Sequence, residues 1–419
     1  MKKPKLFYGF WIVAVTFICL FIHAGAAYYA FPLFYQPLEA EFGWSRGAIS
    51  VAFTIYYATQ ALAAPFIGRL VDQYGAKRFI SLGASLSGLG FLWLTFTNNL
   101  WSFYGGYVVV GLGMAAMGTI PTTQVVSNWF AKRRGLAIGI MSTGVGVGAL
   151  VLAPIVGAYL IPDLGWRAAY LSLAIITWVL TIPLTLMVIK EKPSDIGLYP
   201  DGEKSPEIAT KLNLLSQVSP SWTLSMALKT SILWLIAVGF FAANFSHTGA
   251  IVHQVNYFTD IGFPVATASI TIGAVGFGSA VGKFFFGWLC DQIPVKYATA
   301  ISFALQLTSI IILISFKATS PLAMIWLYTI LMGVGAGGWL PTMSMITSSN
   351  FGLASYGTIF GLVAMTQGLG TALGPLVAGQ MFDAMQTYSG VFIMFAVLYM
   401  IAIPAMLAVR RPKTALSSS

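Results

Sequence analysis

One lysine of this 419-residue sequence lies inside a long apolar stretch, and its charge is the first candidate for chemistry. Lys283 stands in TIGAVGFGSAVGKFFFGWLC, and by helical rise it lies roughly 6 Å deeper in that stretch than Gly287. None of the twelve acidic residues falls in the middle of such a stretch, and Asp291, the nearest in sequence, is eight residues on. A buried cation is costly without a partner, so Lys283 is predicted to bind an anion brought from outside. The alternative is that its flexible side chain reaches a polar surface.

Further polar and aromatic residues in apolar stretches extend the candidate binding set. The three histidines, His23, His247 and His253, all lie in such stretches, where an imidazole can relay a proton or simply bond a neighbouring helix. His247 and His253 are six residues apart, so they point to different helix faces. The remaining candidates are Tyr28, Tyr29, Tyr57, Thr119, Asn244, Trp339 and Phe360. Ordinary packing is the alternative for each aromatic residue.

Motifs for enzymatic chemistry are missing from the sequence. It contains no P-loop, no GxSxG and no HExxH pattern, so neither ATP hydrolysis nor one of these catalytic centres is expected. Cys19 and Cys290 have neither disulfide nor metal-ligand spacing. We therefore predict a protein that is not an enzyme and has no catalytic residues, metal site or cofactor.

The composition predicts the kind of secondary structure that positions the candidate binding residues. Hydrophobic residues make up 58% of the chain and charged residues 8%, whereas soluble domains are about half apolar and about a quarter charged. This predicts an all-α integral membrane protein, because a crossing helix needs about 20 apolar residues. Twelve stretches meet that requirement: 9–35, 46–68, 79–97, 101–127, 135–160, 166–189, 229–257, 265–289, 295–316, 321–347, 355–382 and 386–409.

The distribution of basic residues predicts the orientation. With the N-terminus in the cytoplasm, 18 of the 22 Lys and Arg residues fall on the cytoplasmic side and three on the outside. The formal net charge of +10 is thus explained by topology, and no nucleic-acid partner is predicted. Both termini are expected in the cytoplasm of a multi-pass protein in a plasma membrane, the inner membrane of a bacterium.

The chain divides into two related halves. Residues 1–189 form one predicted six-helix bundle, 190–228 a cytoplasmic linker, and 229–419 a second bundle with a short tail. GRLVDQYGAKR, from Gly68 to Arg78, reappears as GWLCDQIPVKY from Gly287, so that Asp72 matches Asp291. Duplicated bundles are a plan of transporters, because alternating access needs two bodies that move against each other. A non-transporting membrane sensor is a further alternative, but the linker and tails are too short to fold alone.

The repeated motif itself predicts a conformational latch. Glycine permits close helix packing, and a carboxylate at a helix end can cap a neighbouring helix or pair with a guanidinium. The predicted latch residues are Gly68, Asp72, Gly75, Lys77, Arg78, Gly287 and Asp291. A charge cluster that only fixes topology is the alternative.

GRLVDQYGAKR resembles the signature loop of the major facilitator superfamily, and the likeness extends from Tyr8 to Val409. The second copy departs from it, because Pro294 stands where Gly75 is expected. Four segments, FYGFWIV, FGWSRGAIS, NWFAKRRGLAIGIMSTGVGVG and KPSDIGLYPDG, resemble the monocarboxylate transporter and oxalate/formate antiporter branch. The resemblance implies twelve helices, with spans one, four, seven and ten lining a cavity, and favours His253 among the histidines.

The resemblance also gives Lys283 a role. KFFFG aligns with the helix-8 segment where that branch has an anion-binding arginine, so Lys283 replaces a bidentate guanidinium by a point charge. Two other family lysines fall on Leu33 and near Val363, and one remaining cation suits a monocarboxylate better than a dianion. We predict a monomeric carrier of a lactate-, pyruvate-, formate- or acetate-like anion, working by proton symport or anion exchange. The alternative is an exporter of drugs or other amphipathic or neutral solutes.

Overall fold

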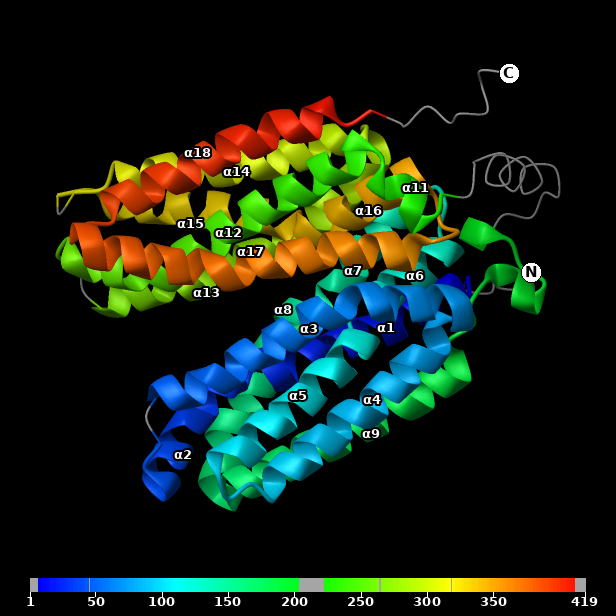
Figure 1. Ribbon diagram of the computed structural model, residues 1–419, viewed down its shortest axis with the longest axis horizontal. Coiled ribbons are helices and arrows are strands. Elements are labelled where there is room, and N and C mark those ends of the chain that lie inside the picture. Colours follow the sequence, from blue (N-terminus) through cyan, green and yellow to red (C-terminus); the bar gives the residue numbers. More distant parts are fainter. Residues whose placement is uncertain (1–6, 45, 203–221, 264, 318, 411–419) are drawn as a thin grey trace, which may run out of the picture. The chain divides into compact units, whose positions relative to one another are not determined.

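Helices make up most of the part of the chain that the structure describes. This computed structural model describes residues 7–44, 46–202, 222–263, 265–317 and 319–410, and no strand occurs in these ranges (Figure 1). The helices form two compact units. Unit 1 comprises Met1–Trp222 with Phe351–Gly361, and unit 2 comprises Thr223–Asn350 with Leu362–Ser419.

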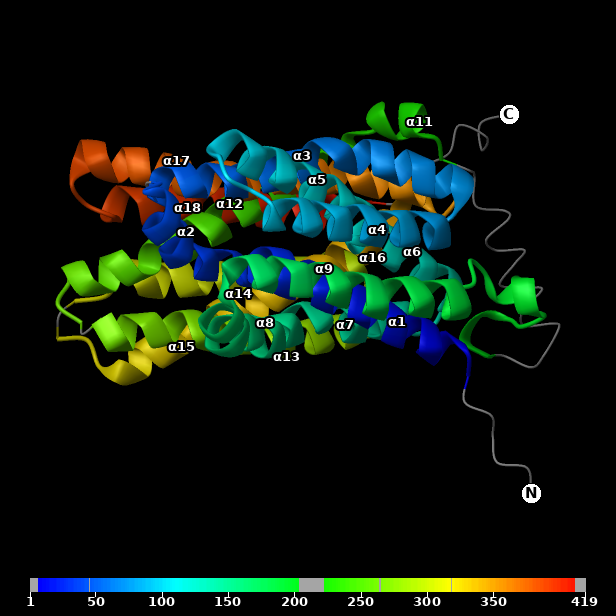
Figure 2. The same cartoon turned by 90° about the horizontal axis from the view of Figure 1, so that it is seen from below.

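Unit 1 contains the helices of the first half of the sequence. They are α1 (Gly9–Ala24), α2 (Tyr35–Phe42), α3 (Arg46–Tyr74), α4 (Ala76–Thr95), α5 (Leu100–Met117), α6 (Thr119–Trp129), α7 (Arg134–Ser142), α8 (Gly144–Ile155) and α9 (Ile161–Val188). Two five-residue π-helical turns, Gly25–Tyr29 and Val156–Leu160, prolong α1 and α8. In two perpendicular views α4 lies between α5 and α9, and it packs against both (Figure 1, Figure 2).

Unit 2 repeats this plan with the second half. Its helices are α11 (Leu224–Leu228), α12 (Ser231–Asp260), α13 (Val265–Gln292), α14 (Val295–Ile314), α15 (Leu322–Gly337), α16 (Trp339–Phe351), α17 (Tyr356–Met385) and α18 (Ser389–Ala408). The first turn of α17 and the last residue of α16 cluster with unit 1. Inside unit 2, α14 packs against α15 and α18, and α12 packs against α18.

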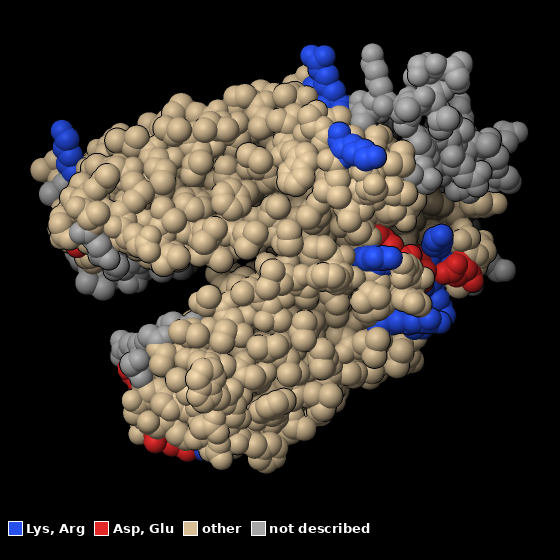
Figure 3. Space-filling model, viewed as in Figure 1, with Lys and Arg blue, Asp and Glu red and all other residues tan. Residues whose placement is uncertain are grey.

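The helices are long and apolar enough to cross a membrane. Ten helical segments of the described chain meet this condition, and one of them, Arg134–Val188, is 55 residues long. That segment is interrupted at Gly165, whose φ of 83° is non-helical, so it provides two crossings. α4 is not one of these ten; it is a 20-residue helix that covers most of the predicted stretch 79–97 and carries Lys77 and Arg78 in its first turn. On the face drawn in Figure 3, charged side chains gather at the helix ends and leave a wide uncharged band.

The fourth and tenth predicted spans are each broken at a glycine. Gly118 separates α5 from α6, and Gly338 separates α15 from α16. Pro121 and Pro341 follow three residues later, and neither can donate a backbone hydrogen bond to the preceding turn. Thr122 and Thr342 donate their hydroxyls to the Gly118 and Gly338 carbonyls, both at 2.7 Å. Each break therefore starts a new helix N-terminus within a span.

Glycines in α8 and α17 allow matching close contacts in the two units. A Cβ on any of them would collide with a carbonyl of the facing helix. Gly144 and Gly148 pack on the carbonyls of Phe17 and Phe21, and Gly370 and Gly374 pack on those of Phe241 and Phe245. Gly144 and Gly148 therefore serve close helix packing, as do Gly370 and Gly374.

The start of the predicted linker is folded against unit 1. The Tyr8 hydroxyl donates to the Val188 carbonyl at 2.8 Å, and the Trp129 indole N–H donates to the Lys190 carbonyl at 2.8 Å. Pro193 is buried. The region 190–202 is thus part of the bundle surface, α11 occupies 224–228, and 203–221 lie outside the described residues.

Two carboxylates of this segment cap neighbouring loops. Glu191 accepts the backbone N–H groups of Ala76 and Lys77, at 3.0 and 2.8 Å, at the start of α4. Asp201 accepts those of Ala131 and Lys132, at 2.9 and 2.8 Å, before α7. We call this end of unit 1 the linker end.

Gly75 has a role in this capping. Its φ is 88°, and a Cβ there would collide with the Glu191 carboxylate. The motif glycine thus provides both the left-handed turn and the space for the capping group. Pro294 occupies the matching position in the second copy, with a φ of −54° before α14.

We expect Glu191→Ala to destabilise the protein. Two N–H groups at the start of α4 would lose a charged acceptor, which costs about 1–2 kcal/mol. Thermal unfolding of the purified protein should show a lowered Tm, with a smaller loss for Glu191→Gln. Gln73→Ala, an exposed neutral residue near the end of α3, is the control. An equal effect of the control would contradict the capping role.

Candidate functional site

The lysine singled out from the sequence is buried in unit 2. Lys283 is 6% exposed and lies on α13. Glycines hold α13 against α15, because a Cβ on Gly282 or Gly337 would collide with the facing backbone. Gly337 lies directly against the backbone nitrogen of Lys283. The backbone of Lys283 therefore lies beside the break between α15 and α16.

The Lys283 ammonium has a neutral partner. Its Nζ donates to the Ser279 hydroxyl, one turn earlier on α13, at 3.0 Å. No carboxylate contacts it in the described ranges of the chain. One hydroxyl leaves most of the desolvation cost of a buried cation uncompensated. The site therefore favours an added negative charge.

Two unpaired polar atoms lie on the helices that surround Lys283. The indole nitrogen of Trp339, in the first turn of α16, is buried without a partner among the described residues. The same holds for Nδ1 of His247 on α12. His247 is bonded to Gln306 and interacts electrostatically with Lys283. The start of α16 adds the positive end of a helix dipole. A cation, an indole donor and a helix N-terminus are all groups that can bind an anion.

Gln306 of α14 links these groups to the rest of unit 2. Its amide nitrogen donates to the Ser302 carbonyl at 3.3 Å, and its oxygen accepts from the Tyr399 hydroxyl at 2.9 Å. Ser302 in turn donates to the Gly335 carbonyl at 2.7 Å, close to the break. These bonds fix the orientation of the amide that holds His247.

Asn244 belongs to a second polar chain between α12 and α17. Gln367 donates to the Asn244 side-chain oxygen at 3.1 Å and to the Thr371 hydroxyl at 2.9 Å. Pro375 has no N–H, so the Thr371 carbonyl lacks its usual helical donor. The Thr248 hydroxyl fills that place at 3.2 Å. Asn244 is thus held by bonds that also stabilise a proline-containing helix.

His253 has partners for both ring nitrogens. Nε2 lies 3.0 Å from the Pro375 carbonyl and must donate to it, and Nδ1 lies 3.1 Å from the Tyr388 hydroxyl. These bonds join α12 to α17 and α18. In this arrangement His253 stabilises the bundle, and a substrate would have to replace one of the two bonds.

The aromatic candidates of unit 1 form one cluster. Tyr28 and Tyr29 lie on the π-helical turn after α1, with ring centroids 4.5 Å apart. Tyr28 also packs on Phe53 and Tyr57 of α3, at 5.7 and 5.9 Å. Turns of this kind are frequent at functional sites. The rings of Tyr28, Tyr29 and Tyr57 thus belong to one aromatic wall.

Thr119 and Phe360, the other two candidates in unit 1, are not part of this aromatic cluster. Thr119 is the first residue of α6, and its carbonyl accepts from the Thr123 hydroxyl at 2.6 Å. Phe360 is fully buried and stacks on Tyr356 with centroids 5.2 Å apart. It packs in the part of α17 that belongs to unit 1.

The predicted latch aspartate caps a helix. Asp72 accepts the N–H groups of Gly357 and Thr358, at 2.8 and 2.7 Å, in the first turn of α17. The Thr358 hydroxyl and the Gln124 amide also donate to it, at 2.6 and 3.1 Å. Four donors and the helix dipole hold this carboxylate. Of the two predicted partners, a helix N-terminus and a guanidinium, the structure shows the first.

The remaining latch residues have different environments. A Cβ on Gly68 would collide with the Gly357 backbone, so this glycine brings α3 and α17 together. Lys77 contributes its backbone N–H to Glu191, and Arg78 is exposed. In the second copy, Gly287 is buried and Asp291 is half-buried near the end of α13.

Sequence reasoning did not select Ser279, Gln306, Gln367 or Glu191 as important residues. Gln306 and Gln367 could have been found as amides inside apolar spans, where an unpaired amide is costly. Ser279 lies one turn from Lys283, a spacing that places side chains together on a helix. The bond from Glu191 to α4 spans 115 residues, and no local pattern indicates it.

Comparison with known proteins defines the class of this fold. The family model described as Major Facilitator Superfamily matches residues 16–264 and 234–419. The crystal structure of the superfamily transporter FucP in the outward conformation has a TM-score of 0.73 at 14% identity, covering 96% of this chain and 99% of that one. The chain is thus a multi-pass membrane transporter, and it belongs to the major facilitator superfamily.

Two similar proteins carry names from the predicted branch. Monocarboxylate transporter 13 of Bos taurus is 25% identical over 364 residues, covering 87% of this chain and 80% of the relative. The oxalate:formate antiporter of Oxalobacter formigenes is 22% identical over 371 residues, covering 88% and 85%. The resemblance drawn from the sequence motifs is confirmed.

Proposed function

We propose that this protein is a secondary transporter of a small monocarboxylate. The observation that carries the proposal is Lys283, a buried ammonium with a hydroxyl partner and no carboxylate contact among the described residues. A carboxylate substrate would supply the missing charge. The names of the relatives, monocarboxylate transporters and an oxalate:formate antiporter, support an anionic substrate.

Proton symport and anion exchange both agree with this site. A desolvated lysine can release its proton, whereas an arginine effectively cannot. Arrival of a carboxylate would favour the charged amine and draw a proton in, and release would reverse this. Lys283 would then couple one proton to one monocarboxylate. In exchange, the ammonium would stay charged and be neutralised by one anion after another.

The proposed cycle is alternating access by a single chain, with Asp72 as part of the latch. The proposed binding residues are Lys283, Trp339, Asn244 and His253 in unit 2 and Tyr28, Tyr29, Tyr57, Thr119 and Phe360 in unit 1. Aromatic walls with few polar groups suit a carboxylate that carries a short apolar tail.

Counterflow in liposomes tests the transport function. Vesicles that contain the purified protein and unlabelled lactate, pyruvate, formate or acetate should accumulate the labelled acid. The corresponding neutral amides should support no accumulation, because they lack the charge that Lys283 requires. Equal counterflow of amides, or of neutral amphipathic solutes alone, would contradict the proposal.

The orientation of the chain is a separate proposal. The basic asymmetry of the sequence places the linker and both termini in the cytoplasm. In a cysteine-free background, Ser205→Cys, which lies outside the described residues, should react with an impermeant maleimide only after the cells are opened. Labelling in intact cells would contradict this orientation and place residue 205 outside the cell.

A further inference from the structure

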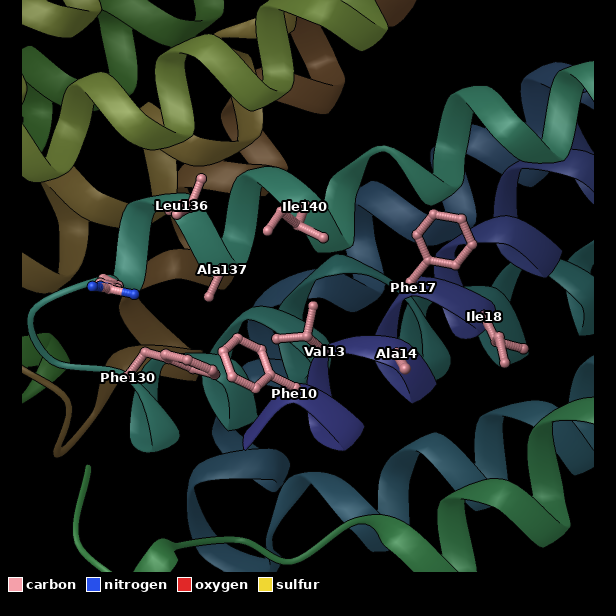
Figure 4. A pocket seen from close by; sticks show the side chains of 10 residues that line it. Phe10, Val13, Ala14, Phe17, Ile18, Phe130, Leu136, Ala137 and Ile140 are labelled. Carbon is pink, nitrogen blue, oxygen red and sulfur yellow. The ribbon is translucent and has the colours of Figure 1, made fainter. Parts of the chain in front are cut away.

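An elongated groove on unit 1 is not used by the proposed transport site. It lies between α1 and α7, encloses about 470 Å³, and is lined by apolar side chains with one exception, Arg133. Figure 4 shows Phe10, Val13, Ala14, Phe17 and Ile18 from α1 along one wall, and Leu136, Ala137 and Ile140 from α7 along the other.

The dimensions of the groove match one leaflet. Phe10 and Ile18 are eight residues apart on one helix, which corresponds to about 12 Å. Half of a bilayer's hydrocarbon core is about 15 Å thick. Phe10 and Ala14 are exposed, so this wall borders the surroundings of the bundle. On a helix that crosses a membrane, an exposed apolar wall of this kind suits contact with acyl chains.

The polar end of the groove carries a positive charge. Phe10 and Phe130 pack together at the linker end, with ring centroids 6.0 Å apart, and Arg133 follows Phe130 by three residues. Arg133 is exposed, and no carboxylate contacts its side chain in the described part of the chain. Asp201 is occupied by backbone N–H groups, including that of Arg133 at 3.4 Å, and so holds this loop in place. A planar guanidinium is well suited to bind a phosphate.

We propose that this groove binds an anionic phospholipid, with an acyl chain between α1 and α7 and the headgroup phosphate on Arg133. The assignment rests on a leaflet-length apolar groove and, at its polar end, a guanidinium that no carboxylate of the described residues contacts. Charge complementarity favours a lipid with net negative charge, such as phosphatidylglycerol, over a zwitterionic lipid with the same chains.

Native mass spectrometry of the purified full chain tests this assignment. Wild-type protein should retain one phosphatidylglycerol about tenfold better than phosphatidylcholine of equal chain length. Arg133→Gln should remove this preference, while Lys229→Gln, a matched exposed cation of unit 2, should keep it. Ala14→Trp should fill the groove and lower retention of both lipids. Its control is Val179→Trp, at an exposed position of α9 outside the groove.

Two outcomes would overturn the proposal. One is equal retention of both lipids by the wild-type protein, which indicates ordinary annular lipid. The other is unchanged phosphatidylglycerol binding in Ala14→Trp. If a variant does not fold, a phosphatidylglycerol with a photoactivatable acyl chain decides the question on the wild-type protein. Its label should fall on residues 10–18 and 136–140, and labelling only elsewhere would also reject the site.

Discussion

Lys283→Ala and Lys283→Gln should abolish carboxylate binding while leaving the protein folded and inserted. Removing the ammonium takes away a buried positive charge that contacts a hydroxyl and no carboxylate among the described residues. A charge-assisted contact is worth about 1.5–3 kcal/mol, so affinity should fall by at least tenfold. The loss of an uncompensated buried charge should also leave thermal stability unchanged or raise it.

Lys283→Arg separates charge from proton transfer. The guanidinium keeps a positive charge, so some binding should remain, although its larger fork requires rearrangement beside Ser279. Because arginine stays protonated, uptake by this variant should depend less on pH between about 5 and 8 than uptake by the wild-type protein. Identical pH profiles would exclude Lys283 as the coupled proton carrier and favour exchange. Ser279→Ala, which removes the hydroxyl partner, should retain binding.

Asp72→Asn should change the transport cycle far more than substrate affinity. The variant would replace a carboxylate that accepts four hydrogen bonds by an amide with one acceptor oxygen. The loss of charge at the start of α17 costs about 1–2 kcal/mol, which changes a conformational equilibrium by roughly five- to thirtyfold. We expect nearly normal binding in detergent together with strongly slowed counterflow.

Graded variants give this prediction its control. Thr358→Val removes one of the four donors and should produce a smaller effect than Asp72→Asn. Gln73→Ala, the exposed neighbour on α3, should behave like the wild-type protein. An Asp72→Asn protein that loses affinity but turns over normally at saturating substrate would refute the latch and place Asp72 in the binding site.

Much of the fold follows from the sequence, because membrane crossing imposes a strong composition signal. The twelve apolar stretches and the repeated motif have counterparts among the described helices. The helix breaks at Gly118 and Gly338 were not predicted, although each glycine stands three residues before a proline. A proline marks a possible break, but packing against neighbouring helices decides whether the span stays continuous.

The candidate site was less accessible to sequence reasoning. The isolation of Lys283 could be inferred by counting charges, since acids in spans are rare and easily located. Hydrogen-bond partners from other helices could not be inferred, because a bond such as that from the Thr358 backbone N–H to the Asp72 carboxylate spans 286 residues. His253 shows the same limit: its bonds to Pro375 and Tyr388 depend on how α12 meets α17 and α18.

The central claim is that a substrate carboxylate neutralises Lys283. Its most direct test is isothermal titration of the wild-type protein and Lys283→Ala with a transported monocarboxylate and its neutral amide. We predict that the wild-type protein binds the acid and not the amide, and that Lys283→Ala binds neither while unfolding at the wild-type temperature or above. Undiminished affinity of Lys283→Ala for the acid would contradict the assignment of the anion site.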